Sequence, residues 1–361
     1  MVVTLDVDGA QASHFAVGTS PLAELMACLH TLAEPEHHPE SRAWLARTRE
    51  ALPEPLVQEL NRFAPLWARY RCRLFLPLRR ALDRELPAEL DTVARLDVDE
   101  FTRLAAFAIR GVTFEGAYEL RDEAVRRAFV KASERRSFSR GELARALVED
   151  PEGFRTRLAD TLERCAAAFF DAEWRRIGPR LKDTAAPVRE QLRKESPLTV
   201  LTSVSPTATG TEQPARVHYD KLQSATGKVA ERGCFLVPTL HGWPHLILKT
   251  GDDGLPLVVH FIAGDWEQRP SARQSLIRDR LAAISEPGRF EMCRHLLGEP
   301  ITTSELAQRT GISEPQVSRH LRRLREVGLV TSRREGRMIY HRLHARLLLS
   351  LGSDVLTTVM R

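Results

Sequence analysis

The chain has 361 residues, of which 43% are apolar and 28% charged, enough apolar material for two or three compact domains and too much for wholesale disorder. Its uninterrupted apolar runs are far shorter than the ~20 residues that a membrane span needs. The first residues, MVVTLDVDGAQ, lack the basic and apolar regions of a secretory signal. We therefore expect a cytoplasmic protein with no membrane partner.

Charge and cysteine usage indicate the kind of partner and exclude two classes of small domain. Residues 271–361 hold 16 arginines, no lysine and nine acidic residues, a net charge of +7, whereas the rest of the chain carries −2. Such a local excess of positive charge indicates a polyanionic partner. The five cysteines are scattered without a CxxC pair, which argues against a disulfide framework and against a thiolate zinc site. We expect reduced thiols.

The first half of the chain has mainly helical periodicity. Apolar residues recur at helical spacing in several segments punctuated by prolines: 21–32, 42–52, 56–86, 99–110, 116–131, 140–148 and 153–181. We predict a helical N-terminal domain over residues 1–197, whose expected role is that of a sensor or an oligomerisation domain. Three tryptophans in this region, at positions 44, 67 and 174, are expected to be core residues.

The residue pattern changes near Pro197. The segment SPLTVLTSVSPTATGTEQPAR is rich in Ser, Thr and Pro and is interpreted as strand plus loop. Short apolar runs then predict strands at RVHYD, CFLVPT, HLILKT and LPLVVHFIA, the last two flanking a turn at 251–254. We predict a β-rich portion and linker over residues 198–270, with a boundary at 264–272, and a separate domain over residues 271–361.

Two short helices with clear start and stop signals follow. The run Thr302-Thr303-Ser304-Glu305 is a capping box, and Gly311 is a C-terminal cap. The series Ser313-Glu314-Pro315-Gln316 predicts the start of the next helix, which should end at Gly328. Two short helices joined by a tight glycine turn form a helix-turn-helix.

Helical geometry separates the two faces of the second helix. At about 100° per residue, Val317, Leu321 and Leu324 share one buried stripe, and His320 lies at its edge. The opposite face presents hydrogen-bonding and basic side chains: Gln316, Ser318, Arg319, Arg322 and Arg323. Glutamine can read adenine and arginine can read guanine in the major groove, whereas serines and a helix N-terminus suit phosphates. This is the chemistry of a recognition helix.

A strand, a glycine-containing turn and a second strand are predicted over residues 329–343. Arg333, Arg334 and Arg337 surround the tip. A hairpin of this kind would form a wing that approaches backbone phosphates or the minor groove.

The segment ITTSELAQRTGISEPQVSRHLRRLREVGLVTSRREGRMIYHRL resembles the winged helix-turn-helix of ArsR-type transcriptional regulators. The resemblance covers a quarter of the chain. It implies a homodimer that binds a palindromic operator in double-stranded DNA, usually as a repressor released by a signal. Ser313, Gln316, Ser318, Arg319 and His320 match the recognition-helix positions of that family, and the three wing arginines match its wing.

The resemblance also implies a dimer seam and excludes one kind of site. The last helix, predicted over 345–359, would form the seam together with the helix around 273–283, and its apolar spacing supports this. The cysteine pair of metal-sensing members would fall near residues 305–308, where this chain has no cysteine. Their carboxylate and histidine ligands would fall in the last helix, where the only such residue is Asp354. We therefore expect no metal and no cofactor. Two N-terminal stretches, SPLAELMACLHTLAEPEHHP and RGCFLVPTLHGWPHL, resemble the extra domain of large ArsR-like regulators from actinobacteria, which implies no function.

Five histidines outside the winged helix form another candidate set of metal ligands. His37, His38, His241, His245 and His260 could bind a metal, but Gly242 and Pro244 break any helix that would place His241 and His245 on one face. Nothing positive supports an enzyme in residues 1–270, since there is no phosphate-binding loop and no nucleophile motif.

The predicted fold class is mostly α with α+β parts: a C-terminal winged helix-turn-helix domain and a large N-terminal helical domain with a small β-rich portion. The predicted function is sequence-specific DNA binding by a homodimeric repressor that answers an unidentified signal, with a small-molecule effector as a candidate partner. The alternative is a winged helix used for protein contacts or structure without DNA binding.

Overall fold

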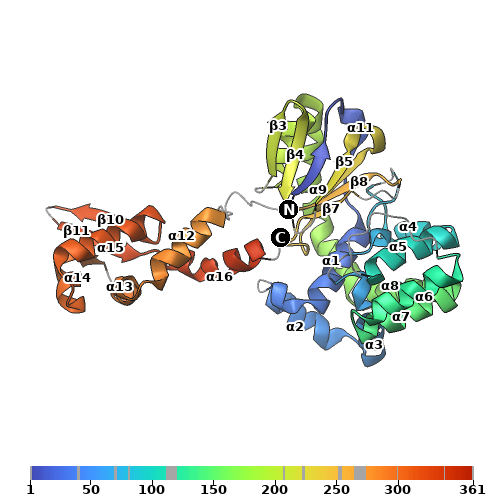
Figure 1. Ribbon diagram of the computed structural model, residues 1–361, viewed down its shortest axis with the longest axis horizontal. Helices are drawn as coiled ribbons and strands as arrows, with labels where there is room; N and C mark the ends of the chain where they lie inside the picture. The colour runs from blue at the N-terminus through green and yellow to red at the C-terminus, as the bar shows by residue number, and fades with distance from the viewer. Residues whose placement is uncertain are drawn as a thin grey trace. The chain divides into compact units, whose positions relative to one another are not determined.

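The computed structural model describes residues 2–38, 41–68, 71–79, 82–110, 120–205, 208–221, 224–250, 254–263, 274–298, 300–336 and 338–359. The chain divides into two compact units, residues 1–268 and residues 269–360 (Figure 1), and this division falls within the predicted boundary segment 264–272. No described helix combines the length and apolar character that crossing a bilayer requires. The predicted fold class is confirmed: helices dominate, and the strands form three small sheets.

The first unit is built mainly from helices. Their bounds are α1 Pro21–Ala33, α2 Arg42–Ala51, α3 Glu54–Phe63, α4 Leu86–Ala94, α5 Val98–Arg110, α6 Glu123–Glu134, α7 Phe138–Glu149, α8 Pro151–Cys165, α9 Asp171–Lys194, α10 Pro197–Ser203 and α11 Val229–Arg232. The side chain of Ser20 accepts a hydrogen bond from the Ala23 amide at the start of α1, which satisfies one of the free N–H groups of the first turn. Every residue of α1 from Pro21 to Thr31 is buried, so this helix lies at the centre of the unit.

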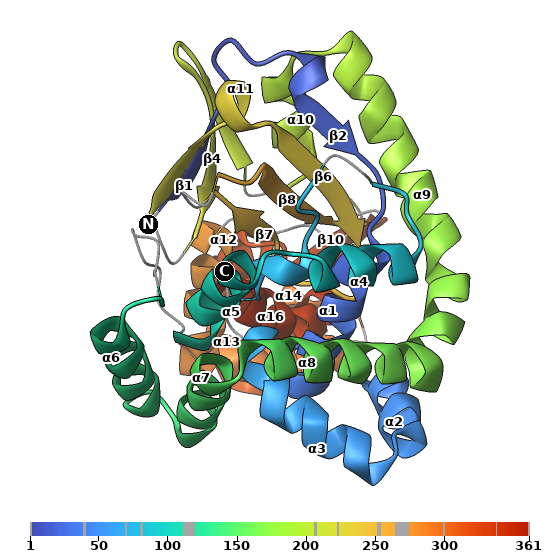
Figure 2. The ribbon, with the colours of Figure 1, turned by 90° about the vertical axis from the view of Figure 1, so that its right-hand side faces the viewer.

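Two four-stranded sheets complete the first unit. Their strands are β1 Val2–Asp6, β2 Phe15–Val17, β3 Ala208–Glu212, β4 Ala215–Asp220, β5 Ala225–Lys228, β6 Cys234–Thr239, β7 Ile247–Lys249 and β8 Leu257–Ile262. One sheet has the order β3-β4-β1-β5 and the other β2-β6-β8-β7. All six residues of β6 are buried, as expected for a central strand covered on both faces. Helix α9 packs beside β2 and β6 (Figure 2).

The structure corrects two predictions for this unit and adds two strands. The segment predicted as strand at the start of the β-rich portion is α10, because Ser196 caps its first turn through the Thr199 amide and Pro197 takes the first helical position. The helix predicted over 56–86 ends at Phe63, where Pro65 introduces a 3-10 turn. Strands β1 and β2 were not predicted. The predicted β7–β8 antiparallel pairing is confirmed, while residues 251–253 of its turn lie outside the described residues.

The second unit contains five helices and one small sheet among its described residues. The elements are α12 Gln274–Ser285, α13 Pro287–Gly298, β9 Ile301–Thr302, α14 Thr303–Thr310, α15 Glu314–Glu326, β10 Val330–Glu335, β11 Met338–Leu343 and α16 Ala345–Val359. The sheet has the order β10-β11-β9 with antiparallel neighbours. A single apolar core joins α12–α15 with the three strands, so the hairpin is held as a wing beside the helices.

Candidate nucleic-acid interface

The first helix of the predicted helix-turn-helix has the expected N-cap and C-cap residues, but only half of the predicted capping box forms, because the Glu305 side chain pairs with Arg309 instead of reaching back. The Thr302 hydroxyl oxygen accepts the Glu305 amide at 3.3 Å, which is the N-cap interaction predicted from the sequence. Gly311 follows α14 with φ of +69°, a left-handed conformation that other residues adopt only with strain. This turn directs the chain into α15.

The start of α15 differs from the prediction. Ser313 makes no side-chain cap; its hydroxyl donates instead to the Gln316 carboxamide oxygen at 2.9 Å. The Gln316 amide is satisfied by the Ser313 backbone carbonyl at the same distance. The two polar side chains are therefore held together at the exposed first turn of the helix.

The two faces of α15 are arranged as predicted. Val317, Leu321 and Leu324 are no more than 1% exposed and lie in the core of the unit. Ser318, Arg319 and Arg322 are exposed, as is Gln316 in the first turn. Within the part of the chain that the structure describes, neither Arg319 nor Arg322 forms an ion pair. Their guanidinium groups therefore reach solvent without a carboxylate partner among the described residues.

Two other predicted residues of α15 turn toward neighbouring acidic groups. Arg323 forms ion pairs with Asp279 of α12 at 3.1 Å and with Glu326 at 3.3 Å. The Nδ1 atom of His320 lies 3.6 Å from a carboxylate oxygen of Glu286, which precedes α13. Both side chains are partly buried. They are less available to a polyanion than Arg319 and Arg322.

The wing forms where it was predicted. Strands β10 and β11 pair from Val330–Leu343 to Glu335–Met338, and Gly336 turns the chain with φ of +61°. Arg333 and Arg334 are exposed, and the Arg334 Nε atom donates to the Gly336 carbonyl at 3.2 Å. The third predicted wing residue, Arg337, lies outside the described residues.

Sequence reasoning missed a buried histidine that ties the wing to the helices. The Nδ1 atom of His341 lies 2.8 Å from the Ser332 hydroxyl on β10, and its Nε2 atom lies 3.1 Å from the Thr303 hydroxyl on α14. Burial and then the nearby Arg325 charge lower the pKa of His341 below its ordinary value. The ring is therefore neutral in the fold, where it joins strand and helix. Its place in an alternating strand pattern was the only local signal.

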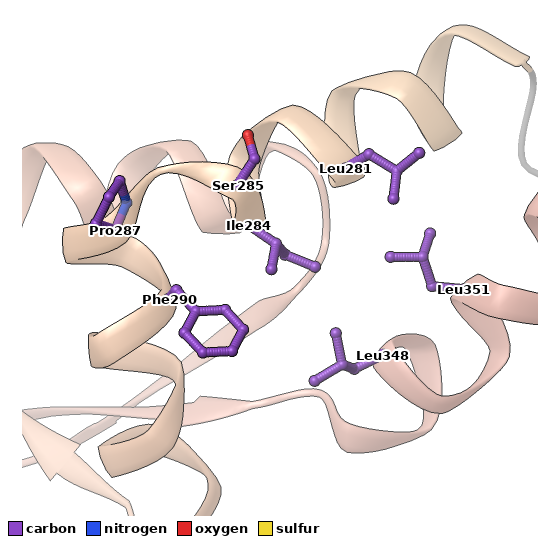
Figure 3. Close-up of a pocket in the computed structure, with 7 residues that line it drawn as sticks. All are labelled: Leu281, Ile284, Ser285, Pro287, Phe290, Leu348 and Leu351. Carbon is purple, nitrogen blue, oxygen red and sulfur yellow. The ribbon is translucent and has the colours of Figure 1, made fainter.

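An apolar groove lies between α12, α13 and α16 (Figure 3). Its lining residues are Leu281, Ile284, Ser285, Pro287, Phe290, Leu348 and Leu351. Phe290 is 57% exposed and Leu281 45% exposed, so large apolar side chains face solvent here. Nearby, a guanidinium nitrogen of Arg280 lies 3.8 Å from the Asp354 carboxylate. Asp354 is the one residue of the last helix that matches the metal ligands implied by the family resemblance. Here its carboxylate faces the buried guanidinium of Arg280 instead.

Comparison with known proteins adds family information to this geometry. Residues 1–267 match the family described as "Family of unknown function (DUF5937)", and residues 284–333 match "Helix-turn-helix domain". Over 40 residues the chain is 48% identical to the arsenic resistance transcriptional regulator ArsR1 of Pseudomonas putida, covering 11% of this chain and 31% of that relative. Over 66 residues it is 33% identical to the transcriptional repressor SdpR of Bacillus subtilis, covering 18% of this chain and 73% of that relative.

A solved structure, described as an ArsR-like transcriptional regulator from Rhodococcus sp. RHA1, is 28% identical with a TM-score of 0.22, and the match covers 22% of this chain and 76% of that one.

Proposed function

Because the chain belongs to the DUF5937 family over residues 1–267 and ends in a winged helix-turn-helix of the ArsR type, we propose that it is a sequence-specific DNA-binding transcriptional regulator, acting as a homodimeric repressor. The exposed face of α15 is the observation that carries this proposal. That face presents Gln316, Arg319 and Arg322 to solvent on a helix whose other side is locked in the core. A recognition helix needs this combination of a rigid backbone and exposed polar side chains.

The contacts divide by chemistry. Arg319 and Gln316, near the N-terminal end of α15, read base edges in the major groove, because guanine and adenine offer the matching acceptors and donors. Ser313 and Ser318 contact phosphates. Arg322 does the same on the outer face of the helix. Arg323 and His320, which already face acidic groups, adjust position rather than read sequence.

The wing supplies a second set of phosphate contacts. Arg333 and Arg334 are exposed on β10, and together with Arg337, which follows the turn in the sequence, they would neutralise backbone charge without regard to base sequence.

A second copy of the chain covers the apolar groove of α12, α13 and α16. Exposed apolar surface of this kind, on a protein that binds a two-fold operator, is explained by a self-complementary interface. Two copies would place their α15 helices in successive major grooves about 34–36 Å apart, which requires a palindromic site. The unit formed by residues 1–268 would then sense an unidentified effector in the cytoplasm, acting only through different affinities for two states of the dimer.

Selection from a random pool of duplex DNA tests this function. The full chain is incubated with the pool, bound duplexes are recovered, and the enriched sequence is titrated by fluorescence anisotropy at two salt concentrations. We expect a palindromic consensus, bound at least about 1,000-fold more tightly than random duplex. Failure to enrich any sequence, with binding no stronger than non-specific, would favour the alternative of a winged helix that contacts protein. Turnover of a small molecule by a chain that does not enrich DNA would favour an enzyme.

A further inference from the structure

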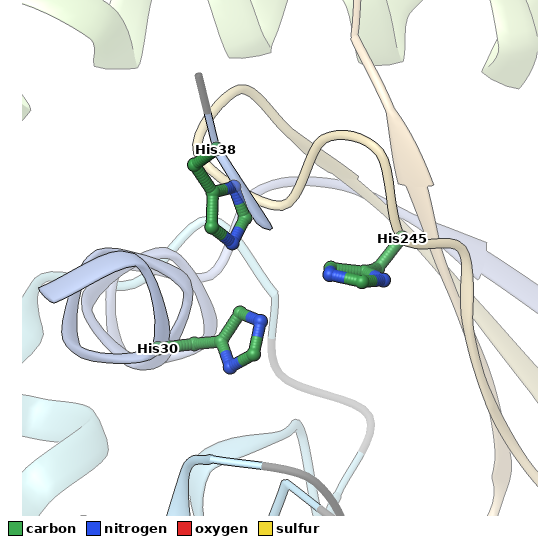
Figure 4. Close-up of side chains that lie close together, drawn as sticks. All are labelled: His30, His38 and His245. Atoms are coloured by element: carbon green, nitrogen blue, oxygen red, sulfur yellow. The ribbon is translucent and has the colours of Figure 1, made fainter. Parts of the chain in front are cut away.

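Three histidines from separate parts of the sequence meet inside the first unit (Figure 4). His30 lies in the last turn of α1, His38 follows a short 3-10 helix, and His245 lies in the turn between β6 and β7. Their ring centroids are 5.0, 5.1 and 5.5 Å apart, and one ring nitrogen of each lies within 4.8 Å of the other two. We propose that these three imidazoles bind a divalent transition-metal ion of the Zn²⁺ class.

The donor set suits this class of ion. Neutral imidazole nitrogens are preferred ligands of Zn²⁺, Co²⁺ and Ni²⁺. With metal–nitrogen distances of about 2.0–2.1 Å in a tetrahedral site, the ligand nitrogens should lie roughly 3.4 Å apart. Because the ligand nitrogens lie within 4.8 Å of one another, each pair needs to close by at most about 1.4 Å to bind an ion in this geometry. Three protein ligands leave a fourth position for water or another small molecule.

Two of the three rings are buried, and the third is partly exposed. His30 is 2% exposed and His38 is fully buried, whereas His245 is only partly buried. An ion would therefore approach past His245 and exchange its bound water for the nitrogens of the two buried rings.

The orientation of His30 is already that of a ligand. Its Nδ1 atom lies 3.1 Å from the Trp67 carbonyl oxygen, and a carbonyl can only accept, so Nδ1 carries the proton. This leaves the lone pair on Nε2. A hydrogen bond from the non-ligating nitrogen to a backbone carbonyl is the usual support of a metal-binding histidine.

The turn that carries His245 is fixed to the same helix as His30. A carboxylate oxygen of Glu24 on α1 accepts the amides of Leu240 and His241 at 3.1 and 2.8 Å. Two turns further along α1, the Thr31 hydroxyl donates to the His241 carbonyl at 3.2 Å. These contacts hold two of the three ligands on one rigid frame, as a preorganised site requires.

Arg71 contacts the proposed ligand nitrogen. Its Nη2 atom lies 2.7 Å from the His30 Nε2 atom, which agrees with a lone pair at that position. A bound metal ion must replace this hydrogen bond, so Arg71 competes with the ion for His30. Removing the guanidinium should therefore strengthen metal binding, an effect opposite to the loss of a ligand.

This proposal departs from the expectation of no metal. The ligand set suggested by the sequence contains His38 and His245 but not His30, and it contains His241, whose Nε2 atom instead lies 2.7 Å from Glu173. These three histidines are also different from the metal-ligand positions that the family resemblance implies, which lie in the second unit.

The test titrates the full chain, stripped with a chelator, with ZnCl₂ in competition with a chromogenic chelator. CoCl₂ is titrated in parallel to follow the visible bands of four-coordinate cobalt. The variants are His38→Gln and His245→Gln as ligand losses, Arg71→Ala as loss of the competitor, and His14→Gln as a matched control in the same unit. Circular dichroism verifies that each variant is folded, and a duplex-binding titration monitors the second unit separately.

We expect the parent and His14→Gln to bind one equivalent of Zn²⁺. The two ligand variants should lose at least about tenfold in affinity together with the cobalt bands, and Arg71→Ala should bind more tightly than the parent. Absence of stoichiometric binding in the folded parent overturns the proposal. So does binding that persists unchanged in folded His38→Gln and His245→Gln, because the ion would then lie elsewhere. Neither outcome affects DNA binding, so this inference and the proposed function fail separately.

Discussion

Replacing Arg319 by alanine should change the sequence preference of the chain without changing its stability. The side chain is exposed and makes no ion pair with any described residue, so the free energy of unfolding should shift by less than about 0.5 kcal/mol. A bidentate arginine–guanine contact discriminates by about 1–3 kcal/mol. This corresponds to roughly 5- to 150-fold between the preferred base and its competitors.

Arg323→Ala is the informative comparison, because Arg323 lies on the same helix but is bonded to Asp279 and Glu326. To reach DNA it would have to leave both carboxylates, so its loss should lower affinity by less than about threefold. Its removal breaks two partly exposed ion pairs, which should lower the free energy of unfolding by about 0.2–1 kcal/mol. Arg294→Ala, at an exposed arginine of α13 paired with Glu291, is the control.

The assay is an anisotropy titration of the selected palindrome and of its single-base variants at two salt concentrations, with thermal unfolding of each protein. Arg319→Ala should bind the variants almost as well as the palindrome. An equal loss on every sequence would show that Arg319 only neutralises phosphate. A loss of specificity in Arg323→Ala as large as that in Arg319→Ala would show that the internal ion pairs do not decide which arginines read DNA.

Four further outcomes follow from single contacts. Arg334→Ala should weaken binding to all duplexes alike and reduce the salt slope by about one per protomer, which the same titrations measure. Burial raises the pKa of Glu89 from 4.5 to about 7. Between these two pH values the folded chain retains a proton that the unfolded chain releases, so the free energy of unfolding falls as the pH rises from 4.5 toward 7. Glu89→Gln should remove this fall and be about 1–3 kcal/mol more stable than the parent at pH 8 but not at pH 4.5; a difference independent of pH in urea unfolding would contradict it. His341→Ala should lower the free energy of unfolding of the second unit by about 2 kcal/mol, and the parent should itself lose stability as pH falls below the ordinary histidine pKa; no change in thermal unfolding would contradict the role of this ring. Leu281→Glu should convert dimers to monomers in sedimentation experiments, whereas Phe138→Glu, at an 80% exposed apolar residue of α7, should not; a parent that is already monomeric would refute the interface.

The winged helix could be predicted from the sequence because each of its signals is local. The threonine cap of α14, the left-handed Gly311 and the 3.6-residue spacing of Val317, Leu321 and Leu324 act within a few residues of one another. The buried strands β6 and β8 were recognisable for the same reason, as short apolar runs.

Only the tertiary structure decided the features that depend on distant residues. Val3 of β1 pairs with Tyr219 and Ala225, more than 200 positions away, and nothing in either segment indicates the other. Arg319 and Arg323 look alike in the sequence, but the position of Asp279 on another helix makes only one of them available. His30 and His245 likewise lie near each other because α1 holds the turn after β6. Side chains brought together by packing across a whole domain leave no periodicity in the chain, and for that reason the fold had to be known before they could be found.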